Sequence, residues 1–467
     1  MPAWAIPLPS NRGSCRAESG QSGAAGGFHG ETASGPERGL GYRIALPLYG
    51  DAMTQPPSPA PLASAAALGF SAERLARIDR FLAERYVEPG LLPGALLLVA
   101  RRGELVHRTV LGHASLERRQ KLEEDTIFRI YSMTKPVTSV AFMMLAEENR
   151  ISLDDPVAKW IPSWRDQAVF AAGLPGAFAT RPVAAPMRVI DLLRHTSGLT
   201  YGFQNRTNVD AAYRALNLDT SAHESLAGFC EALGRVPLEF SPGTSWNYSV
   251  STDVVGHLVS LASGLPFDEF VRSRILQPLA MHDTDFHVPE AKAARFADNY
   301  VRSAEGTLAP APLLGGDFLQ PPRAPSGGGG LVGTAADYLR FCEMLRRGGE
   351  LDGVRLLGPR TLALMRMNHL PGGRDLADLA PPGMFSEAAY QGMGFGLGFA
   401  MVTDPARYGV AVSPGEYSWG GMASTAFWVD PVEDVCVVFM TQLMPSSTYP
   451  VRRELRTMVN AAIVEPA

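Results

Sequence analysis

Strand-like runs lie near both ends of this 467-residue chain, and a long stretch of short helices and loops separates them. Near the start, Gly94–Arg101 and Glu104–Gly112 are joined in the manner of a hairpin. Near the end, Thr425–Val429 is placed to pair with Val435–Met440 across a turn. Because residues from about 150 to 325 have a mostly helical pattern, we expect one antiparallel sheet built from both chain ends. The predicted class is α+β, with helices flanking the sheet and a helical insertion.

Helices are expected on either side of the strand runs. Ser71–Tyr86 has its apolar residues on one face, which is typical of a helix packed on a core. Thr334 opens a second helix with a capping-box pattern, and this helix closes at Gly348. A third helix is expected near Val451–Ile463. The run Gly392–Val402 alternates glycine with apolar residues and is interpreted as a further part of the sheet.

The first 62 residues differ from the rest of the chain in composition. They are rich in Gly, Ser, Ala and Pro and offer little apolar surface to bury, so residues 1–62 are expected to be disordered. An alternative is that Met53 is the true start and that residues 1–52 are a mis-annotated extension. In both cases the folded domain is expected to span residues 63–467, with the helical insertion at about 150–325.

The charge balance gives no reason to expect a broad basic surface. The chain has 42 Lys and Arg against 47 Asp and Glu, and its isoelectric point is near 6.0. We therefore expect no nucleic-acid partner and no membrane partner. No apolar run reaches about 18 residues, and no signal-peptide pattern is visible, so a cytoplasmic location is expected. The four cysteines are far apart in sequence, which favours reduced thiols over a disulfide framework.

Lysine is scarce in this chain, and one lysine stands beside a candidate nucleophile. Only four of the 42 basic residues are lysines, and Lys135 follows Ser132 by three positions. Pro136 is tolerated only in a first helical turn, which places Ser132 at a helix start, where residues three apart share a face. A buried lysine can lose its proton, so the two residues form a candidate nucleophile and base. The alternative is a helix-capping serine beside an incidental lysine.

Two further segments carry candidate site residues. Tyr248 stands at the entry to a helix that ends at Gly264, where a phenol could contact the serine and carry protons. The motif Trp419-Gly420-Gly421 leads into a core strand, and paired glycines let a ligand approach the strand backbone closely. Each segment also has an ordinary structural explanation, namely a half-buried packing tyrosine and a bulge or turn.

Together, Ser132-x-x-Lys135, Tyr248-Ser249-Val250 and Trp419-Gly420-Gly421 resemble the motifs of the serine β-lactamase and penicillin-binding-protein superfamily. The resemblance is closest to the class C β-lactamase-like esterases, the family VIII carboxylesterases. Residues 151–157, 191–199 and 328–331 are also similar to that family. The resemblance covers about residues 65–462 and implies a three-layer α/β/α fold of the β-lactamase/transpeptidase type.

The sequence departs from the penicillin-recognising members of this superfamily at two places. Those proteins carry Lys-Thr-Gly on the last core strand, whereas Trp419-Gly420-Gly421 stands there in this chain and no lysine follows Lys292. Class C enzymes have an asparagine two residues after the tyrosine, where this chain has Val250. Both changes remove polar recognition of β-lactams. The resemblance therefore favours less charged substrates, with short-chain carboxylic esters as the expected class.

The expected reaction is ester hydrolysis through an acyl-enzyme on Ser132, with Lys135 and Tyr248 as the general base and acid pair. The sequence leaves open which of the two is the base, because they titrate as a coupled pair. The resemblance implies that the backbone N–H groups of Ser132 and Met422 hold the oxyanion. The residues expected to line the substrate pocket are Tyr131, Tyr201, Phe203, Tyr417, Trp419, Gly420 and Gly421.

Three other functions remain compatible with these residues. They are a β-lactamase or D-Ala-D-Ala peptidase, an acyltransferase that uses the same acyl-enzyme, and a non-catalytic binding module of the same fold. His195 is interpreted as structural, because the chain has no Gly-x-Ser-x-Gly elbow, and Gly327–Gly330 is interpreted as a tight bend. No cofactor and no metal are expected. The expected partner is a small-molecule ester, and the sequence does not specify an oligomeric state.

Overall fold

The central element of the fold is an eight-stranded sheet whose strands come from both ends of the chain. The computed structural model describes residues 61–312, 316–380 and 391–467, which lie in one unit, Ser58–Ala467. The strands of this sheet are β1 (Gly94–Arg101), β2 (Glu104–Ser115), β3 (Gln120–Lys121), β12 (Met393–Phe395), β13 (Ala400–Val402), β14 (Tyr417–Gly420), β15 (Ala426–Asp430) and β16 (Val435–Met440). Their order is β12-β13-β14-β15-β16-β1-β2-β3, and β1 pairs with β16 in antiparallel register. The predicted sheet is confirmed.

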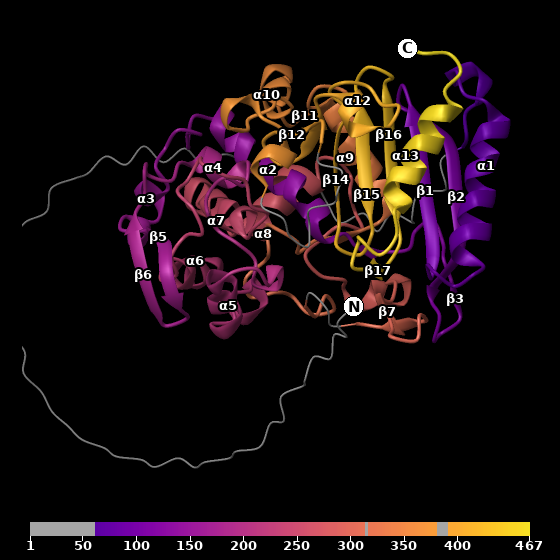
Figure 1. Ribbon diagram of the computed structural model, residues 1–467. Coiled ribbons are helices and arrows are strands. Elements are labelled where there is room, and N and C mark those ends of the chain that lie inside the picture. The colour runs from indigo at the N-terminus through magenta and orange to yellow at the C-terminus, as the bar shows by residue number, and fades with distance from the viewer. Residues whose placement is uncertain (1–60, 313–315, 381–390) are drawn as a thin grey trace, which may run out of the picture. The chain divides into compact units, whose positions relative to one another are not determined.

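Helices cover both faces of this sheet, as Figure 1 shows. One face is covered by α1 (Ala72–Leu82) and α13 (Val451–Ala462), and the other by α9 (Ala335–Arg346) together with α2 (Thr134–Glu147). Successive residues of β1 point to opposite faces. Leu97 accordingly belongs to the apolar cluster with α1 and α13, whereas Leu98 belongs to the larger cluster with α2 and α9. The three-layer α/β/α arrangement is therefore confirmed.

The middle of the chain forms a group of helices around α7. These helices are α3 (Val157–Trp160), α4 (Val189–Leu193), α5 (Asn208–Ala215), α6 (Leu226–Leu233), α7 (Ser251–Ser263) and α8 (Phe267–Val271). Helices α2, α4, α6 and α8 all contact α7. The same region also contains two hairpins that the sequence pattern did not indicate, β5 (Ala168–Leu174) with β6 (Ala177–Pro182) and β7 (Tyr300–Arg302) with β8 (Leu308–Pro310).

The remaining elements are short. They are α10 (Pro359–Met365), α11 (Leu376–Leu379), α12 (Pro405–Tyr408), β4 (Phe128–Arg129), β9 (Val332–Gly333), β10 (Glu350–Leu351), β11 (Val354–Arg355) and β17 (Leu443–Met444). The run Gly392–Val402 is not one strand, because β12 and β13 pair with each other as a hairpin. Gly398 has a φ of +107° within the reversal between them, a conformation that favours glycine.

Several local predictions are confirmed. The first hairpin pairs β1 with β2, and the predicted pairing of the last two core strands is that of β15 with β16. The Thr334 side chain accepts a hydrogen bond from the Asp337 N–H and caps α9. The predicted N-terminal disorder and the alternative start at Met53 concern residues that lie outside those the structure describes, apart from residues 61 and 62.

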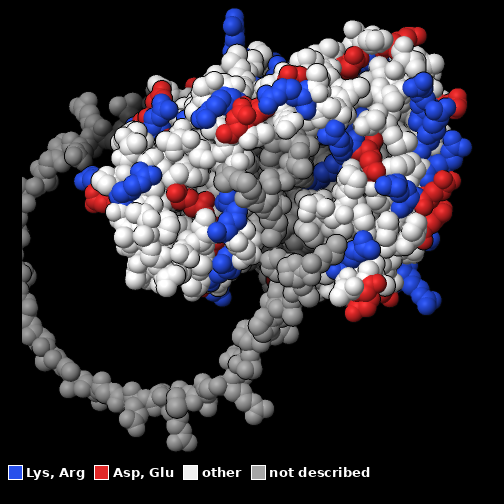
Figure 2. Space-filling model, in the orientation of Figure 1, with Lys and Arg blue, Asp and Glu red and all other residues white. Residues whose placement is uncertain are grey.

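Surface and thiol chemistry complete the description. In the part of the chain that the structure describes, no helix is long and apolar enough to cross a membrane. Cys230, Cys342 and Cys436 are buried free thiols. On the face shown in Figure 2, positive and negative side chains lie interspersed over the described residues.

Candidate active site

Ser132 lies in a 3-10 turn, Tyr131–Met133, that runs directly into α2. Tyr131 has a φ of +43°, which is uncommon for a residue with a side chain and is found mostly where the surrounding structure imposes it. Pro136 stands in the first turn of α2, as predicted. The serine is therefore held at the N-terminal end of a long buried helix, where the helix dipole favours negative charge.

The Lys135 side chain is buried, with 1% of its surface exposed, and its Nζ atom contacts three oxygens. These are the Gly328 carbonyl at 2.7 Å, the Tyr201 hydroxyl at 3.0 Å and Ser132 Oγ at 3.3 Å. A carbonyl can only accept a hydrogen bond, so Lys135 Nζ donates to the Gly328 carbonyl. The rest of the amine group faces the hydroxyls of Tyr201 and Ser132. The predicted nucleophile and amine are thus within hydrogen-bonding reach of each other.

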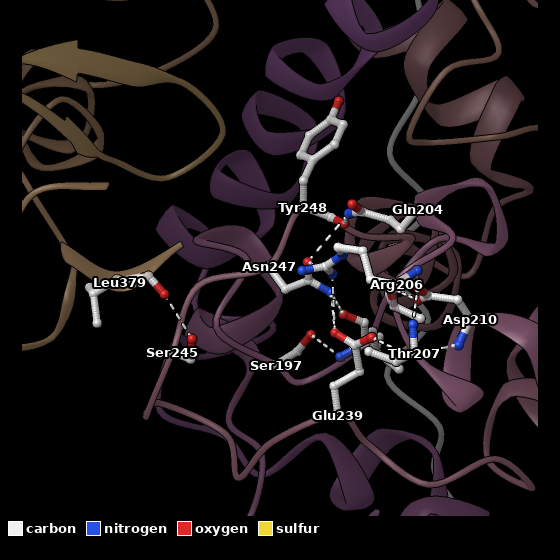
Figure 3. Close-up of polar contacts among 12 residues, drawn as sticks. Ser197, Gln204, Arg206, Thr207, Asp210, Glu239, Ser245, Asn247, Tyr248 and Leu379 are labelled. Carbon is white, nitrogen blue, oxygen red and sulfur yellow. Dashed lines mark hydrogen bonds and ion pairs between the residues drawn. The ribbon is translucent and has the colours of Figure 1, made fainter. Parts of the chain in front are cut away.

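The Tyr248 ring faces the same amine, with its centroid 4.5 Å from Lys135 Nζ. Its backbone is fixed by polar contacts, because Gln204 Nε2 donates to the Tyr248 carbonyl at 2.8 Å. The neighbouring Asn247 donates to Glu239 at 2.8 Å. Figure 3 shows the Tyr248 ring pointing away from this polar cluster. The cluster therefore anchors the main chain at Tyr248, while the Tyr248 ring lies against the Lys135 amine.

Trp419 and Gly420 end β14, Gly421 follows directly, and β14 lies against the 3-10 turn that carries Ser132. The Trp419 indole N–H donates to the Tyr248 hydroxyl at 3.3 Å. A Cβ atom on Gly421 would lie 2.4 Å from the backbone oxygen of Ile130. Only glycine fits this close approach of two main chains, which explains the second glycine of the motif.

The backbone N–H groups of Ser132 and Met422 are the candidates for an oxyanion hole. The Gly421 N–H is bound to the Thr425 carbonyl at 2.9 Å. The next N–H, that of Met422, has no acceptor among the residues that the structure describes. Ser132 and Met422 line the same two cavities. The donors implied by the family resemblance therefore border one shared opening, where an oxyanion would need them.

Two cavities meet at Ser132. The larger has a volume of about 360 Å³ and the smaller about 120 Å³, and Ser132, Tyr248 and Met422 line both. Of the predicted pocket residues, the larger cavity is lined by Tyr131, Tyr201 and Phe203, and the smaller by Trp419, Gly420 and Gly421. A separate cavity of about 570 Å³ near Leu216 is lined by none of these residues. Chemistry rather than size therefore identifies the candidate site.

Tyr417 was predicted to line the pocket, and this prediction is corrected by the structure. Its side chain is fully buried and packs against the Phe399 ring with centroids 4.9 Å apart. It lines neither of the two cavities at Ser132. The reason is its position along the strand, because two residues correspond to about 7 Å. Tyr417 thus lies one pleat deeper in the core than Trp419.

Asp253 was not recognised from the sequence as a site residue. This side chain is 3% exposed on α7 and accepts hydrogen bonds from the Ser326 hydroxyl and, at 2.9 Å, from the Gly328 N–H. It also lines the larger cavity. A signal was present in the sequence, since Asp253 stands beside Val250 and Val254 on the apolar stripe of its helix, where an unpaired carboxylate is rare.

Burial sets the protonation of the groups around Lys135. Burial raises the pKa of Tyr201 well above its ordinary range, so this phenol stays protonated. Burial also raises the pKa of Asp253, while the positive charge of Lys135 opposes that shift. Burial, aided by Lys135, lowers the pKa of His195 well below its ordinary range. His195 Nδ1 contacts Ser249 Oγ at 3.3 Å, and its neutral ring fits a structural role.

The Gly327–Gly330 bend has a direct place in the site, because its Gly328 carbonyl accepts from Lys135. Thr138 of α2 donates to the Gly327 carbonyl at 2.8 Å and holds the bend from the other side. Within the described ranges, no group of three or more His, Cys, Asp or Glu side chains is gathered to hold a metal ion. Beside Ser132 the site contains the amine of Lys135 and the phenol of Tyr201, and Arg452, Arg453 and Arg456 line its smaller cavity.

The β-lactamase family model matches residues 81–460 of this chain. The chain therefore belongs to the β-lactamase family, a family of serine hydrolase fold with esterase and acyltransferase relatives. The predicted membership of this superfamily is confirmed.

Individual relatives narrow the comparison. Protein Rv1367c of Mycobacterium tuberculosis is 36% identical over 77% of this chain and 88% of its own length. Esterase EstB of Burkholderia gladioli is 32% identical over 79% of this chain and 91% of its own length. The solved structure of EstCE1, described as a hydrolase with promiscuous acyltransferase activity, is 25% identical, has a TM-score of 0.69 and covers 84% of this chain and 98% of that one. The predicted likeness to β-lactamase-like esterases is thus confirmed.

Proposed function

We propose that this protein is a serine carboxylesterase that hydrolyses esters through an acyl-enzyme on Ser132. The observation that carries this proposal is the contact of a buried Lys135 amine with Ser132 Oγ at 3.3 Å, at the junction of two cavities. The position of the third-motif lysine is taken by Trp419, so a cation for substrate carboxylates is missing from that place in the sequence. The 32% identity to an esterase supports the same choice.

The proposed reaction has two steps. Ser132 Oγ attacks the ester carbonyl carbon while its proton passes to the Lys135 and Tyr248 pair, and the same pair returns a proton to the departing alcohol. The N–H groups of Ser132 and Met422 stabilise the oxyanion, each contributing about 3 kcal/mol. Water then attacks the acyl-enzyme by the reverse proton route. The acid leaves and Ser132 is regenerated.

The two cavities suggest how an ester is held. An ester has two arms on either side of its carbonyl, and the two cavities meet at Ser132 with volumes of about 360 and 120 Å³. The aromatic rings of Tyr201 and Phe203 stack 4.5 Å apart in the wall of the larger cavity. We therefore expect one arm to be bulky and apolar and the other to be short. Short-chain esters of aromatic alcohols combine these features.

The test is the Ser132→Ala variant, assayed with p-nitrophenyl esters of increasing chain length and with a serine-directed phosphonate. The exposed serine variant Ser152→Ala is the matched control. We expect Ser132→Ala to lose both ester turnover and labelling, and Ser152→Ala to retain both. Hydrolysis or labelling that survives in Ser132→Ala would rule out the proposed nucleophile. In the control and the wild type, we expect butyrate to be cleaved faster than dodecanoate.

A second candidate is acyl transfer, which uses the same acyl-enzyme and differs only in the acceptor. It is favoured by the similarity to EstCE1, described as a hydrolase with promiscuous acyltransferase activity. Product analysis in the presence of an added alcohol separates the two, because a transferase releases the new ester and a hydrolase releases the acid.

Turnover of nitrocefin faster than that of esters would instead favour a β-lactamase, and failure of Ser132 to label would favour a non-catalytic binding module.

A further inference from the structure

Asp253 is a buried carboxylate for which the proposed reaction has no role so far. The Gly328 N–H donates to the Asp253 carboxylate at 2.9 Å, and the Gly328 carbonyl accepts a hydrogen bond from Lys135 Nζ at 2.7 Å. A single residue thus links the carboxylate on α7 to the amine on α2. We propose that Asp253 is a positioning residue that fixes the Gly327–Gly330 bend against Lys135 and supplies the negative charge that balances the Lys135 ammonium. This inference rests on the proposed function of the same site.

The bend is clamped between two helices. Thr138 of α2 donates to the Gly327 carbonyl at 2.8 Å, and Asp253 of α7 accepts from the Gly328 N–H at 2.9 Å. A Cβ atom on Gly328 would lie 2.6 Å from Asp253 Oδ2, so the main chain is pressed against the carboxylate. Ser326 donates its hydroxyl to the same carboxylate. The carboxylate therefore determines where the Gly328 carbonyl lies, and this carbonyl holds Lys135.

Two of the titratable groups near Lys135 carry no negative charge at neutral pH. His195 is neutral because burial lowers its pKa, and Tyr201 is protonated because burial raises its pKa. Tyr248 presents its ring face to Nζ. Asp219, on the wall of the larger cavity, acts on Asp253 as a like charge. A carboxylate near an ammonium in a desolvated site favours the charged form of both groups, and Asp253 is the carboxylate that Gly328 joins to Lys135.

The test compares Asp253→Asn with Ser326→Ala. Asparagine keeps an oxygen for the Gly328 N–H but loses the charge, whereas Ser326→Ala keeps the charge and removes one hydrogen bond. The measurements are kcat/KM for p-nitrophenyl butyrate and the rate of phosphonate labelling of Ser132, each from pH 5 to 10. We expect Asp253→Asn to lose on the order of tenfold in kcat/KM. We also expect the limb of its pH–rate profile that reflects Lys135, whether acid or alkaline, to move to lower pH by about one unit.

The limb of the pH–rate profile that moves also identifies the general base. A shifted acid limb means that the neutral Lys135 amine takes the Ser132 proton, and a shifted alkaline limb means that Lys135 acts as an ammonium beside Tyr248. We expect the limbs to stay in place in Ser326→Ala and to return to their wild-type positions in Asp253→Glu. Limbs that stay in place in Asp253→Asn would overturn the proposal, whatever the loss in rate.

A thermal melt serves as the control for correct folding of the variants. Asparagine removes a buried charge and keeps an acceptor, so the Tm of Asp253→Asn is expected to equal or exceed that of the wild type. A large fall in Tm together with unmoved limbs would show a purely structural residue and would overturn the proposal. If the wild type labels at Ser132 but hydrolyses no ester, the proposed function fails, yet the pH dependence of labelling still decides the role of Asp253.

Discussion

Two buried carboxylates of this protein face two buried cations in different ways. Glu416, with 0% of its surface exposed, pairs directly with Arg456 at 2.7 Å, next to the start of β14. Asp253 forms no direct ion pair with Lys135 within the described structure, because Gly328 lies between them and binds both. The first pair ties the sheet to α13, and the second lies at the candidate active site.

The difference lies in what each cation is free to do. An arginine keeps its proton in a protein, so Arg456 cannot act as a base, and its direct pair with Glu416 fixes its position in the wall of the smaller cavity. Lys135 meets its carboxylate through a peptide group and keeps a contact of 3.3 Å with Ser132 Oγ. A carboxylate that acts through Gly328 balances the charge of the Lys135 amine without binding the amine directly. We regard this as the arrangement that proton transfer requires.

The largest effect is expected when the two cations are tested by exchanging lysine for arginine at one position and arginine for lysine at the other. Lys135→Arg keeps a positive charge but cannot lose a proton, so kcat/KM for p-nitrophenyl butyrate should fall on the order of 10⁴-fold. Arg456→Lys should leave kcat/KM within about tenfold of the wild type and lower Tm instead, because an ammonium does not reproduce the guanidinium contacts. Near-normal hydrolysis by Lys135→Arg would remove the distinction between the two pairs.

A smaller effect is expected from the tyrosines that surround Lys135. Tyr248→Phe removes a hydroxyl that accepts from Trp419 and is proposed to carry protons, so kcat should fall by about 10²- to 10³-fold. Tyr201→Phe removes one of the three acceptors of Lys135 and should cost about tenfold, because the Ser132 and Gly328 contacts remain. Steady-state kinetics of both variants provide the measurement. A greater loss in Tyr201→Phe than in Tyr248→Phe would reverse the roles proposed for the two phenols.

The sequence predicted what is encoded locally. Ser132 and Lys135 are three residues apart at the start of a helix, so helical periodicity places them together, and the strand-like runs near both chain ends predicted the sheet. Tyr248 and Trp419 were only weak candidates by themselves, and the family resemblance of their motifs joined them to Ser132. The contacts of Gly328 with Asp253 and Lys135 join positions 75 and 193 residues apart, and no local pattern encodes such distances. Tyr417 was misplaced because a motif does not show where its strand passes into the core.

The smallest effect on activity, and a distinct effect on stability, is expected at Glu416. Burial raises its pKa to about 7, although Arg456 opposes the shift, whereas the unfolded value is near 4.5. The folded state therefore holds the proton more tightly, and the stabilisation present below pH 4.5 is lost as the pH rises through about 7. Unfolding by urea at pH 5 and pH 8 should show the wild type losing up to ~3 kcal/mol relative to Glu416→Gln, which has no proton to lose. Ester hydrolysis by the folded variant should stay within about twofold of the wild type, because Glu416 does not line the cavities at Ser132. A stability difference that does not change with pH would mean that the direct pair with Arg456 keeps Glu416 ionised, and a loss of hydrolysis would mean that the structural pair also serves the site.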